Sequence, residues 1–171
     1  SLWKGIVLTP DEKVVEEALR ILEPRIEGLA IITDESRSVS NDDRGSVLVK
    51  LKGESTPVPL GSMGDGMYRM LILTLSLITA AGGVLAIDEI DTGLHHTVLT
   101  AMWRLLSATA KRLNVQVFAT THSRDCVESL AGVIENKPDQ ELTFAIHRID
   151  KDKTESVDYS ERQITIAAEQ G

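Results

Sequence analysis

Cysteine and aromatic residues are scarce in this sequence of 171 residues. With Cys126 as its one cysteine, the chain can form no internal disulfide, and we expect a reducing setting such as the cytoplasm. Phe, Trp and Tyr make up 4% of the residues, so a core must consist mainly of Leu, Ile, Val and Ala. The longest apolar segment, residues 70–81, is too short for a membrane span, and we expect no membrane partner.

Basic residues are also fewer than acidic ones. The chain has 18 Lys and Arg against 26 Asp and Glu, which gives a formal net charge of −8. This balance excludes a surface that is basic all over, as a general nucleic-acid binder presents. Contact with DNA through a local patch stays open, because short basic clusters such as Lys111-Arg112 occur.

Apolar patterns of strand and helix type alternate along the chain and predict an α/β fold with parallel strands. The strands are expected at residues 2–8, 26–33, 46–52, 84–87 and 115–120. A first helix is expected from Pro10, with Thr9 as its N-cap. The later helices are expected at residues 64–80, 96–113 and 124–130.

Antiparallel hairpins are expected at the periphery of this fold. Residues 26–33 would pair with 46–52 across a polar loop at 34–45, and residues 142–149 would pair with 156–159. Ser160 and Gln163 form the pattern of a capping box, which predicts a terminal helix. Because no repeat or linker interrupts the chain, we treat it as a single domain, with regions 1–60, 61–131 and 132–171.

Reactive side chains gather where two of the expected strands end. The apolar pattern at residues 84–87 predicts a buried strand, which ends at Asp88 and Glu89. The strand expected at 115–120 is followed by His122. Ligands bind at the carboxyl ends of the strands in an open parallel sheet. We therefore expect these three side chains to meet at one rim.

The chemistry of these side chains suits a phosphate ligand. One carboxylate could hold Mg²⁺, which binds one or two carboxylates together with substrate phosphates. The other could orient or deprotonate a water molecule, and His122 could donate a hydrogen bond to a phosphate. A glycine-rich stretch, PLGSMGDGM at residues 59–67, precedes a long helix, and the amides at a helix N-terminus favour an anion.

Each feature taken alone also has a plainer structural explanation. Asp88 and Glu89 could be acids at a helix start, His122 could be a structural hydrogen-bond partner, and the glycine-rich stretch could be a turn. His95 and His96 are adjacent and so do not converge on one metal ion. The order and spacing of the features together favour a functional interpretation.

In that order the features resemble the C-terminal half of an ABC-type ATPase, of the branch that includes RecF, SMC and OLD (overcoming lysogenization defect) proteins. VLAIDEIDTGLHH is similar to a Walker B motif that runs into a D-loop, VFATTHSRD to an H-loop, and GSMGDGMYRML to a diverged signature motif. The resemblance covers residues 60–130. It implies part of a P-loop NTPase fold, ATP and Mg²⁺ as ligands, and work in DNA repair, DNA maintenance or phage defence.

The resemblance also implies roles for single residues. Asp88 would organise Mg²⁺, Glu89 would polarise the attacking water, and His122 would sense the γ-phosphate. Asp91 would belong to the D-loop, which crosses to a partner subunit. The signature segment would contact the ATP that is bound to the opposite protomer, through Ser62, Met63, Gly64, Asp65 and Gly66.

One part of such an ATPase is not in the sequence. A P-loop, G-x-x-x-x-G-K-[ST], holds the β- and γ-phosphates, and no Gly-Lys-Ser or Gly-Lys-Thr occurs here. Because the P-loop of the family lies upstream, we expect a lobe whose Walker A half is separate or removed. Alone, this lobe would hydrolyse ATP negligibly. When complete, it would form an ATP-dependent homodimer or oligomer, coupled to DNA or to a nuclease partner.

Two other classes of function stay open. The first is a non-catalytic interaction module, a degenerate ATPase lobe that presents its signature motif to a partner, and the lack of a P-loop favours it. The second is a small metal-dependent phosphohydrolase that uses Asp88, Glu89 and Asp91 as metal ligands.

Overall fold

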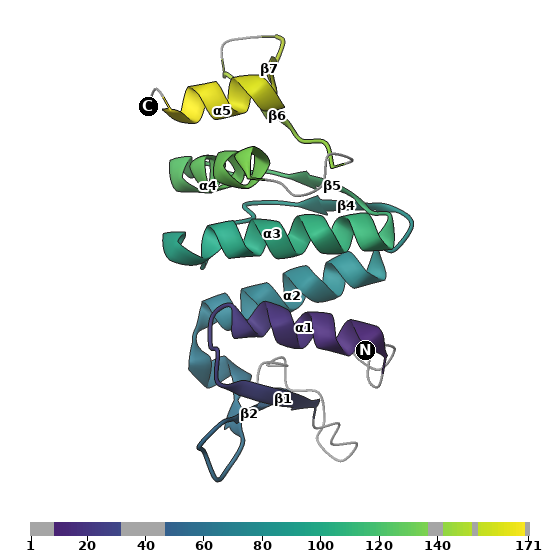
Figure 1. The fold of residues 1–171 in the computed structure, drawn as a ribbon, viewed down its shortest axis with the longest axis vertical. Coiled ribbons are helices and arrows are strands. Elements are labelled where there is room, and N and C mark those ends of the chain that lie inside the picture. Colours follow the sequence, from purple (N-terminus) through teal and green to yellow (C-terminus); the bar gives the residue numbers. More distant parts are fainter. Residues whose placement is uncertain (1–8, 32–46, 137–141, 152–153, 170–171) are drawn as a thin grey trace.

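The computed structural model describes residues 9–31, 47–136, 142–151 and 154–169. Figure 1 shows an elongated stack, with a small sheet at one end, helices and a strand pair in the middle, and a hairpin with the last helix at the other end. The strand expected at 2–8 and the loop expected at 34–45 lie outside the described residues. Within the described ranges, no helix is long and apolar enough to cross a membrane.

The first described element is a helix with the predicted start. α1 (Pro10–Arg20) follows Thr9, whose hydroxyl accepts a hydrogen bond from the N–H of Asp11 at 3.3 Å. The predicted N-cap and the proline at the first helical position are therefore confirmed. The apolar face of α1 is buried in the core through Val15 and Leu19.

A small antiparallel sheet follows α1. β1 (Ile26–Ile31) pairs with β2 (Val47–Leu51), which confirms the first predicted hairpin, and β3 (Val58–Pro59) adds a short third strand. Alternate residues of β2 are buried, so this sheet has one face on the core and one toward solvent.

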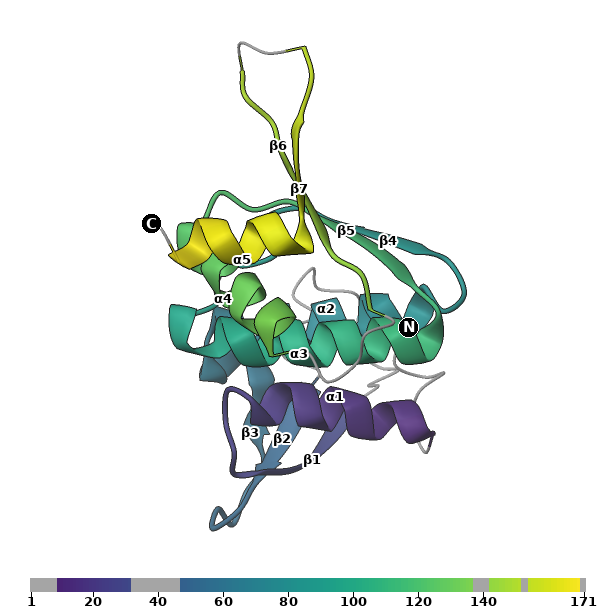
Figure 2. The same cartoon turned by 45° about the horizontal axis from the view of Figure 1, so that its top comes forward.

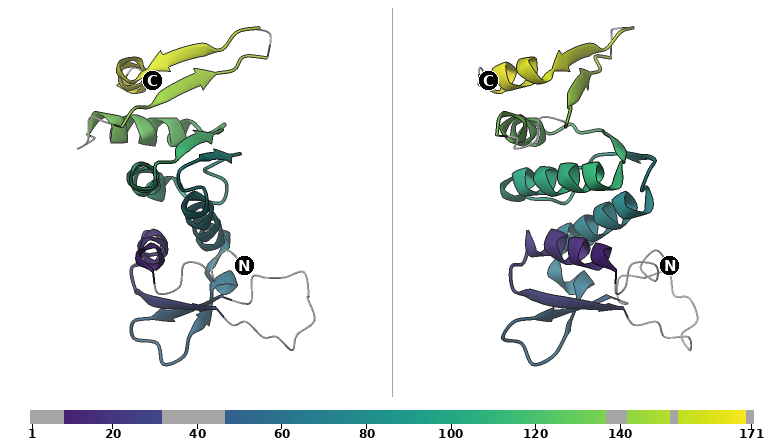
Figure 3. Two further views of the ribbon diagram at one scale, coloured as in Figure 1. Left: turned by 90° about the vertical axis from the view of Figure 1, so that its right-hand side faces the viewer. Right: turned by 45° about the vertical axis from the view of Figure 1, so that its right-hand side comes forward.

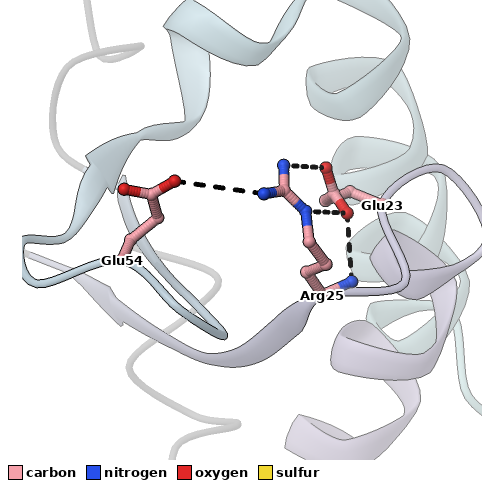
Figure 4. A network of polar contacts seen from close by, with 3 residues as sticks. All are labelled: Glu23, Arg25 and Glu54. Carbon is pink, nitrogen blue, oxygen red and sulfur yellow. Dashed lines mark hydrogen bonds and ion pairs between the residues drawn. The ribbon is translucent and has the colours of Figure 1, made fainter.

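An exposed polar network ties the chain before β1 to the turn after β2 (Figure 4). Arg25 donates to the carboxylate of Glu23 from Nε at 3.1 Å and from Nη2 at 2.9 Å, and its Nη1 lies 3.9 Å from Oε1 of Glu54. The hydrogen bond from Arg25 lowers the pKa of Glu23, and the same bond raises the pKa of Arg25. The network is exposed to solvent, so it adds little to stability at neutral pH.

The hydrophobic core centres on two long helices. The short 3-10 helix η3 (Leu60–Met63) leads into α2 (Asp65–Thr79), and α3 (His96–Leu113) has the predicted bounds. Most of the α2 surface is apolar and buried, as the sequence indicates. Met70 of α2 and Met102 of α3 are each 1% exposed, at the centre of this core.

Two parallel strands lie beside these helices, as predicted. β4 (Val84–Ile87) has the predicted bounds, and β5 (Gln116–Ala119) is one residue shorter at each end than expected. The register pairs Val84 with Gln116 and Ile87 with Ala119. The carboxyl ends of both strands therefore lie at the same rim.

The pair is not buried on both faces, which corrects the expectation of a buried strand for residues 84–87. Leu85 and Val117 pack against the core, and helices lie on that side of the pair (Figure 3). On the opposite face Val84 is 62% and Phe118 is 56% exposed. Parallel sheets are normally covered on both faces, and no described element covers this one.

The next helix is longer than predicted. α4 (Arg124–Glu135) continues past the expected end at residue 130 because Ala131, Val133 and Ile134 extend its buried face. α4 packs along α3, and the indole N–H of Trp103 donates to the carbonyl of Cys126 at 3.1 Å.

The described chain ends in a hairpin and a helix. β6 (Ala145–Arg148) pairs antiparallel with β7 (Val157–Ser160), and α5 (Glu161–Glu169) follows, which confirms the expected order. The hairpin projects from the body of the molecule (Figure 2). Oε1 of Gln163 accepts the backbone N–H of Ser160 at 2.9 Å, so the predicted capping pair is formed.

Candidate functional site

The acid turn, residues 88–93, begins directly after β4. Asp88 and Glu89 are both exposed, so their charges are in contact with solvent. Glu89 has a φ of 46°, in the left-handed region that few non-glycine residues adopt. A residue persists in this region only where its surroundings fix the backbone, and hydrogen bonds from two neighbouring elements do so here.

The first of these elements is the end of β5, through Thr120. Its hydroxyl accepts the N–H of Glu89 at 2.9 Å and donates to Oδ1 of Asp88 at 2.5 Å. Its backbone N–H donates to the carbonyl of Ile87 at 2.9 Å, and its carbonyl accepts the N–H of Ile90 at 3.0 Å. One threonine thus orders both acids at the rim.

Two further threonines hold the carboxylates of the acid turn. The hydroxyl of Thr92 donates to Oε2 of Glu89 at 3.0 Å, and the hydroxyl of Thr121 donates to Oδ1 of Asp91 at 2.5 Å. Each carboxylate keeps further lone pairs for a ligand. The acid side chains are therefore oriented without being neutralised by an ion pair in the described chain.

An open pocket of about 300 Å³ lies at this rim, lined by Glu89, Asp91, Thr92, His122 and Ser123. Of the three residues expected at this rim, Glu89 and His122 line the pocket and Asp88 does not. Asp91, which the prediction did not place there, also lines it. His122 is exposed and forms no hydrogen bond or ion pair within the described part of the chain. Its ring is available to a ligand in the pocket.

The expected signature residues lie at the start of α2, against the acid turn. A Cβ on Gly66 would be 2.8 Å from the carbonyl oxygen of Gly93, so the two backbones are in contact. Gly64 has a φ of 98° and precedes α2 without a side-chain cap. The hydroxyl of Ser62 donates to the carbonyl of Pro59 at 2.7 Å.

These signature residues differ in their exposure. Ser62, Gly64 and Asp65 are exposed, whereas Met63 is half-buried and packs against the core. A ligand that approaches the start of α2 therefore meets the serine, a glycine and the aspartate first. The acidic side chain of Asp65 also suits the positive end of the helix.

Sequence reasoning did not identify Arg69 of α2. Its Nη2 donates to the carbonyl oxygens of Asp88 at 2.8 Å and of Glu89 at 2.7 Å. This is the second element that fixes the acid turn. The one available signal is that Arg69 is a charged residue in a helix that is otherwise almost wholly apolar after Asp65.

The side chains present fit one side of a Mg²⁺ site. Asp88 is exposed, and its hydrogen bond from Thr120 uses Oδ1, which leaves Oδ2 for a cation. In the ranges that the structure describes, no three His, Cys, Asp or Glu side chains are grouped to hold a metal ion. Mg²⁺ needs no such group when phosphates and water complete its coordination, so these residues fit Mg²⁺ that arrives with a nucleotide.

Cys126 is not a candidate nucleophile. It is fully buried, and burial raises the pKa of its thiol, although a hydrogen bond with Thr121 opposes the rise. A thiol with a raised pKa is a poor nucleophile at neutral pH.

The fold is that of a P-loop NTPase of the kind found in SMC ATPase heads. Residues 9–125 match the family described as "AAA domain, putative AbiEii toxin, Type IV TA system", and the chain belongs to this family. A protein of Helicobacter pylori named ATP/GTP phosphatase is 32% identical over 107 residues, which are 59% of this chain and 28% of that protein. An uncharacterised protein of Methanocaldococcus jannaschii is 35% identical over 68 residues, 40% of this chain and 60% of that protein.

Two solved structures share the fold. One comes from work on ATP-driven dimerization and DNA stimulated activation of SMC ATPases; it has a TM-score of 0.55 and 13% identity, over 94% of this chain and 89% of that one. The other is an SMC head bound to the C-winged helix domain of ScpA, with a TM-score of 0.55 and 12% identity, over 88% and 42%. The chain spans less than a third of the Helicobacter protein and about three fifths of the Methanocaldococcus protein.

Proposed function

We propose that this chain is the ATP-hydrolysing lobe of an SMC-like ATPase and that a separate Walker A lobe completes it. The observation that carries the proposal is the pocket that Glu89, Asp91 and His122 line at the rim of β4 and β5. The carboxylate of Glu89, which could orient a water molecule, and the imidazole of His122, which could bind a phosphate, then face the same pocket. Phosphoryl transfer depends mostly on such positioning and electrostatics.

The contacts of Asp88 and of the pocket residues support a role for each. Asp88 would hold Mg²⁺ through Oδ2, and Mg²⁺ would neutralise charge on the phosphates. Glu89, held by Thr92 through Oε2, would accept a hydrogen bond from the attacking water with Oε1. His122 would donate to the terminal phosphate.

The exposed face of β4 and β5 supports a second lobe. Val84 and Phe118 present apolar side chains on a parallel strand pair, which proteins cover on both faces. A Walker A lobe on this face would bring its phosphate-binding amides and lysine next to the acid turn. This fits the lack of Gly-Lys-Ser and Gly-Lys-Thr in the sequence.

The signature segment and the acid turn support an ATP-dependent dimer. Gly64 and Asp65 are exposed beside Thr92 and Gly93, so a partner protomer could contact both segments at once. Nucleotide bound to the partner would then bridge the two copies. We propose dimer or oligomer formation as the output of ATP binding, and separation as the output of hydrolysis.

The pathway is proposed from the relatives alone. SMC ATPases are stimulated by DNA, and an SMC head binds ScpA, whereas the family description names a toxin–antitoxin system. We propose DNA repair, DNA maintenance or phage defence as the setting, in the cytoplasm, with DNA or a nuclease among the partners. A flat salt dependence of DNA binding would remove direct contact with DNA through this lobe.

A non-catalytic module is the second candidate, and the lack of a P-loop sequence favours it. A lobe of this kind would present its signature segment to the nucleotide of a partner and would need no attacking water. The hydrogen bonds that orient the Asp88 and Glu89 side chains weigh against it. The third candidate, a phosphohydrolase with a metal cluster of its own, loses support because no such cluster is found among the described residues.

The test compares phosphate release from Mg·ATP by the chain alone and by the chain together with its Walker A lobe. We expect negligible hydrolysis alone, and hydrolysis by the complete protein that Glu89→Gln lowers by about a hundredfold or more. Glu17→Gln is the matched control, because Glu17 is an exposed glutamate on α1 that does not line the pocket. Equal loss in both variants, or none in either, rejects the catalytic role of Glu89.

A further inference from the structure

Two contacts join the start of α2 to the acid turn. Gly66, in the first turn of the helix, touches the backbone of Gly93. Arg69, one turn later, reaches across to the carbonyls of Asp88 and Glu89. The glycine-rich start of α2 and the acid turn are therefore held together at both ends of the turn.

The side chain of Arg69 is half-buried at this contact. Its Nε is buried and has no hydrogen-bond partner within the described residues, while one nitrogen, Nη2, donates to both carbonyls. Hydrogen bonds from a charged donor are stronger than those from a neutral one. Arg69 is half-buried, it donates to backbone oxygens, and no ion pair with an acid is found for it among the described residues. Its contacts therefore hold a backbone conformation.

The fixed conformation is that of Glu89. Glu89 has a positive φ, and the carbonyls of Asp88 and Glu89 both accept from Arg69 of α2. The carboxylate of Glu89 accepts from Thr92 and lines the pocket. Thr120 holds the same residue from the opposite element through its N–H. Without the hydrogen bonds from Arg69, the N–H of Glu89 still donates to Thr120. The left-handed backbone of Glu89 then loses the contacts that hold its carbonyl.

We propose that Arg69 is a positioning residue that ties the orientation of Glu89 to the position of the glycine-rich start of α2. The inference rests on the proposed function, since it assigns to Arg69 the alignment of the residue that would orient the attacking water. A ligand that moves or steadies the start of α2 also moves or steadies Glu89. A contact at the signature segment would thereby change the orientation of Glu89 in the pocket through the side chain of Arg69.

The test uses Arg69→Gln and Arg69→Lys in the complete protein, with Arg104→Gln as control. Arg104 is an exposed arginine on α3 whose side chain forms no hydrogen bond or ion pair in the described chain. For Arg69→Gln we expect kcat to fall by about tenfold or more, because a small misplacement of a reacting group is costly, while KM for Mg·ATP stays within about twofold. Arg69→Lys should recover part of kcat, since an ammonium still donates to carbonyls.

A second measurement reports the backbone itself. Hydrogen exchange of the amides of Ile90 and Thr92, which close the acid turn, should rise by about tenfold in Arg69→Gln, while the Thr120 amide between β4 and β5 should not change. A uniform rise across the chain would mean that Arg69 serves general stability, and would overturn the proposal. So would an unchanged exchange rate at the acid turn.

The two proposals fail in different ways. If the unsubstituted protein hydrolyses ATP and Arg69→Gln does so equally well, the role of Arg69 is wrong and the ATPase stands. If the unsubstituted protein does not hydrolyse ATP, the proposed function fails, and the catalytic role of Arg69 fails with it.

Discussion

Substitution of Gly66 by alanine tests the contact between the signature segment and the acid turn. The new Cβ would lie 2.8 Å from the carbonyl oxygen of Gly93, which is closer than any ordinary contact of a Cβ with a backbone atom. One of the two backbones must shift, and such overpacking costs about 1–3 kcal/mol. Alanine also favours helix, by at most about 1 kcal/mol and less in a first turn. The net expectation is a loss of about 1–2 kcal/mol of unfolding free energy.

The matched control is Gly132→Ala. Gly132 lies inside α4, and a Cβ there would meet nothing within 4 Å. The same chemical change should therefore stabilise the protein by up to about 1 kcal/mol. Thermal unfolding followed by circular dichroism measures both variants, at about 2–4 °C per kcal/mol for a chain of this size. If Gly66→Ala unfolds at or above the temperature of the unsubstituted protein, the contact with Gly93 is not as close as described.

Three further predictions concern other contacts. Thr120→Val should lower the unfolding free energy by about 1 kcal/mol, because it removes both hydrogen bonds of the Thr120 hydroxyl; chemical denaturation measures this, and an unchanged midpoint would contradict it. The hydrogen bond from Arg25 lowers the pKa of Glu23 below 4.5. This contact therefore stabilises the fold above that pH, and the stabilisation is lost as the pH falls further. Glu23→Gln should remove this contribution to the change of melting temperature with pH. Because burial raises the pKa of Cys126, a thiol reagent at neutral pH should modify it more slowly than free cysteine, and equal rates would show that the thiol is accessible.

Local signals in the sequence were enough for most of the secondary structure. Thr9 with Pro10 marked the start of α1, and the bounds of β4 and α3 were predicted without error. The predicted end of α4 was too early, because Gly132 is an interior residue of the helix and Val133 and Ile134 after it are buried. Where a helix ends depends on whether the side chains of its next turn can pack against the rest of the fold. The local sequence pattern does not specify this.

The exposure of β4 could not be predicted in the same way. An apolar run of four residues indicates a strand covered on both faces, and Leu85 does face the core. Val84 is 62% exposed on the other face, which no described element covers. An apolar run thus predicts a strand, but it does not specify which of its faces another element covers.

The sequence indicated the reactive side chains of the candidate site, but not the residues that hold them in place. Asp88, Glu89 and His122 could be identified because their chemistry and their places after apolar strands are visible in the sequence. Arg69 and Thr120 form hydrogen bonds with Asp88 and Glu89, which lie 19 to 32 residues away in the chain. Such contacts depend on how α2 and β5 pack against the acid turn, and no local pattern records them.

Under the proposed function, the charge of the acid turn should link assembly to nucleotide binding. Asp88 and Glu89 are solvated here, so their charge costs little, but a lobe that covered Val84 and Phe118 would also remove water from the rim next to them. Burial of unpaired charge is unfavourable, and a bound cation compensates it. Mg·ATP and the Walker A lobe should therefore strengthen each other's binding by the same factor, because such coupling is reciprocal. Sedimentation of the two lobes with and without Mg·ATP measures the factor. Asp88→Asn removes one of the two charges and should make association less dependent on the nucleotide; equal association under all these conditions would show that the acids do not oppose assembly.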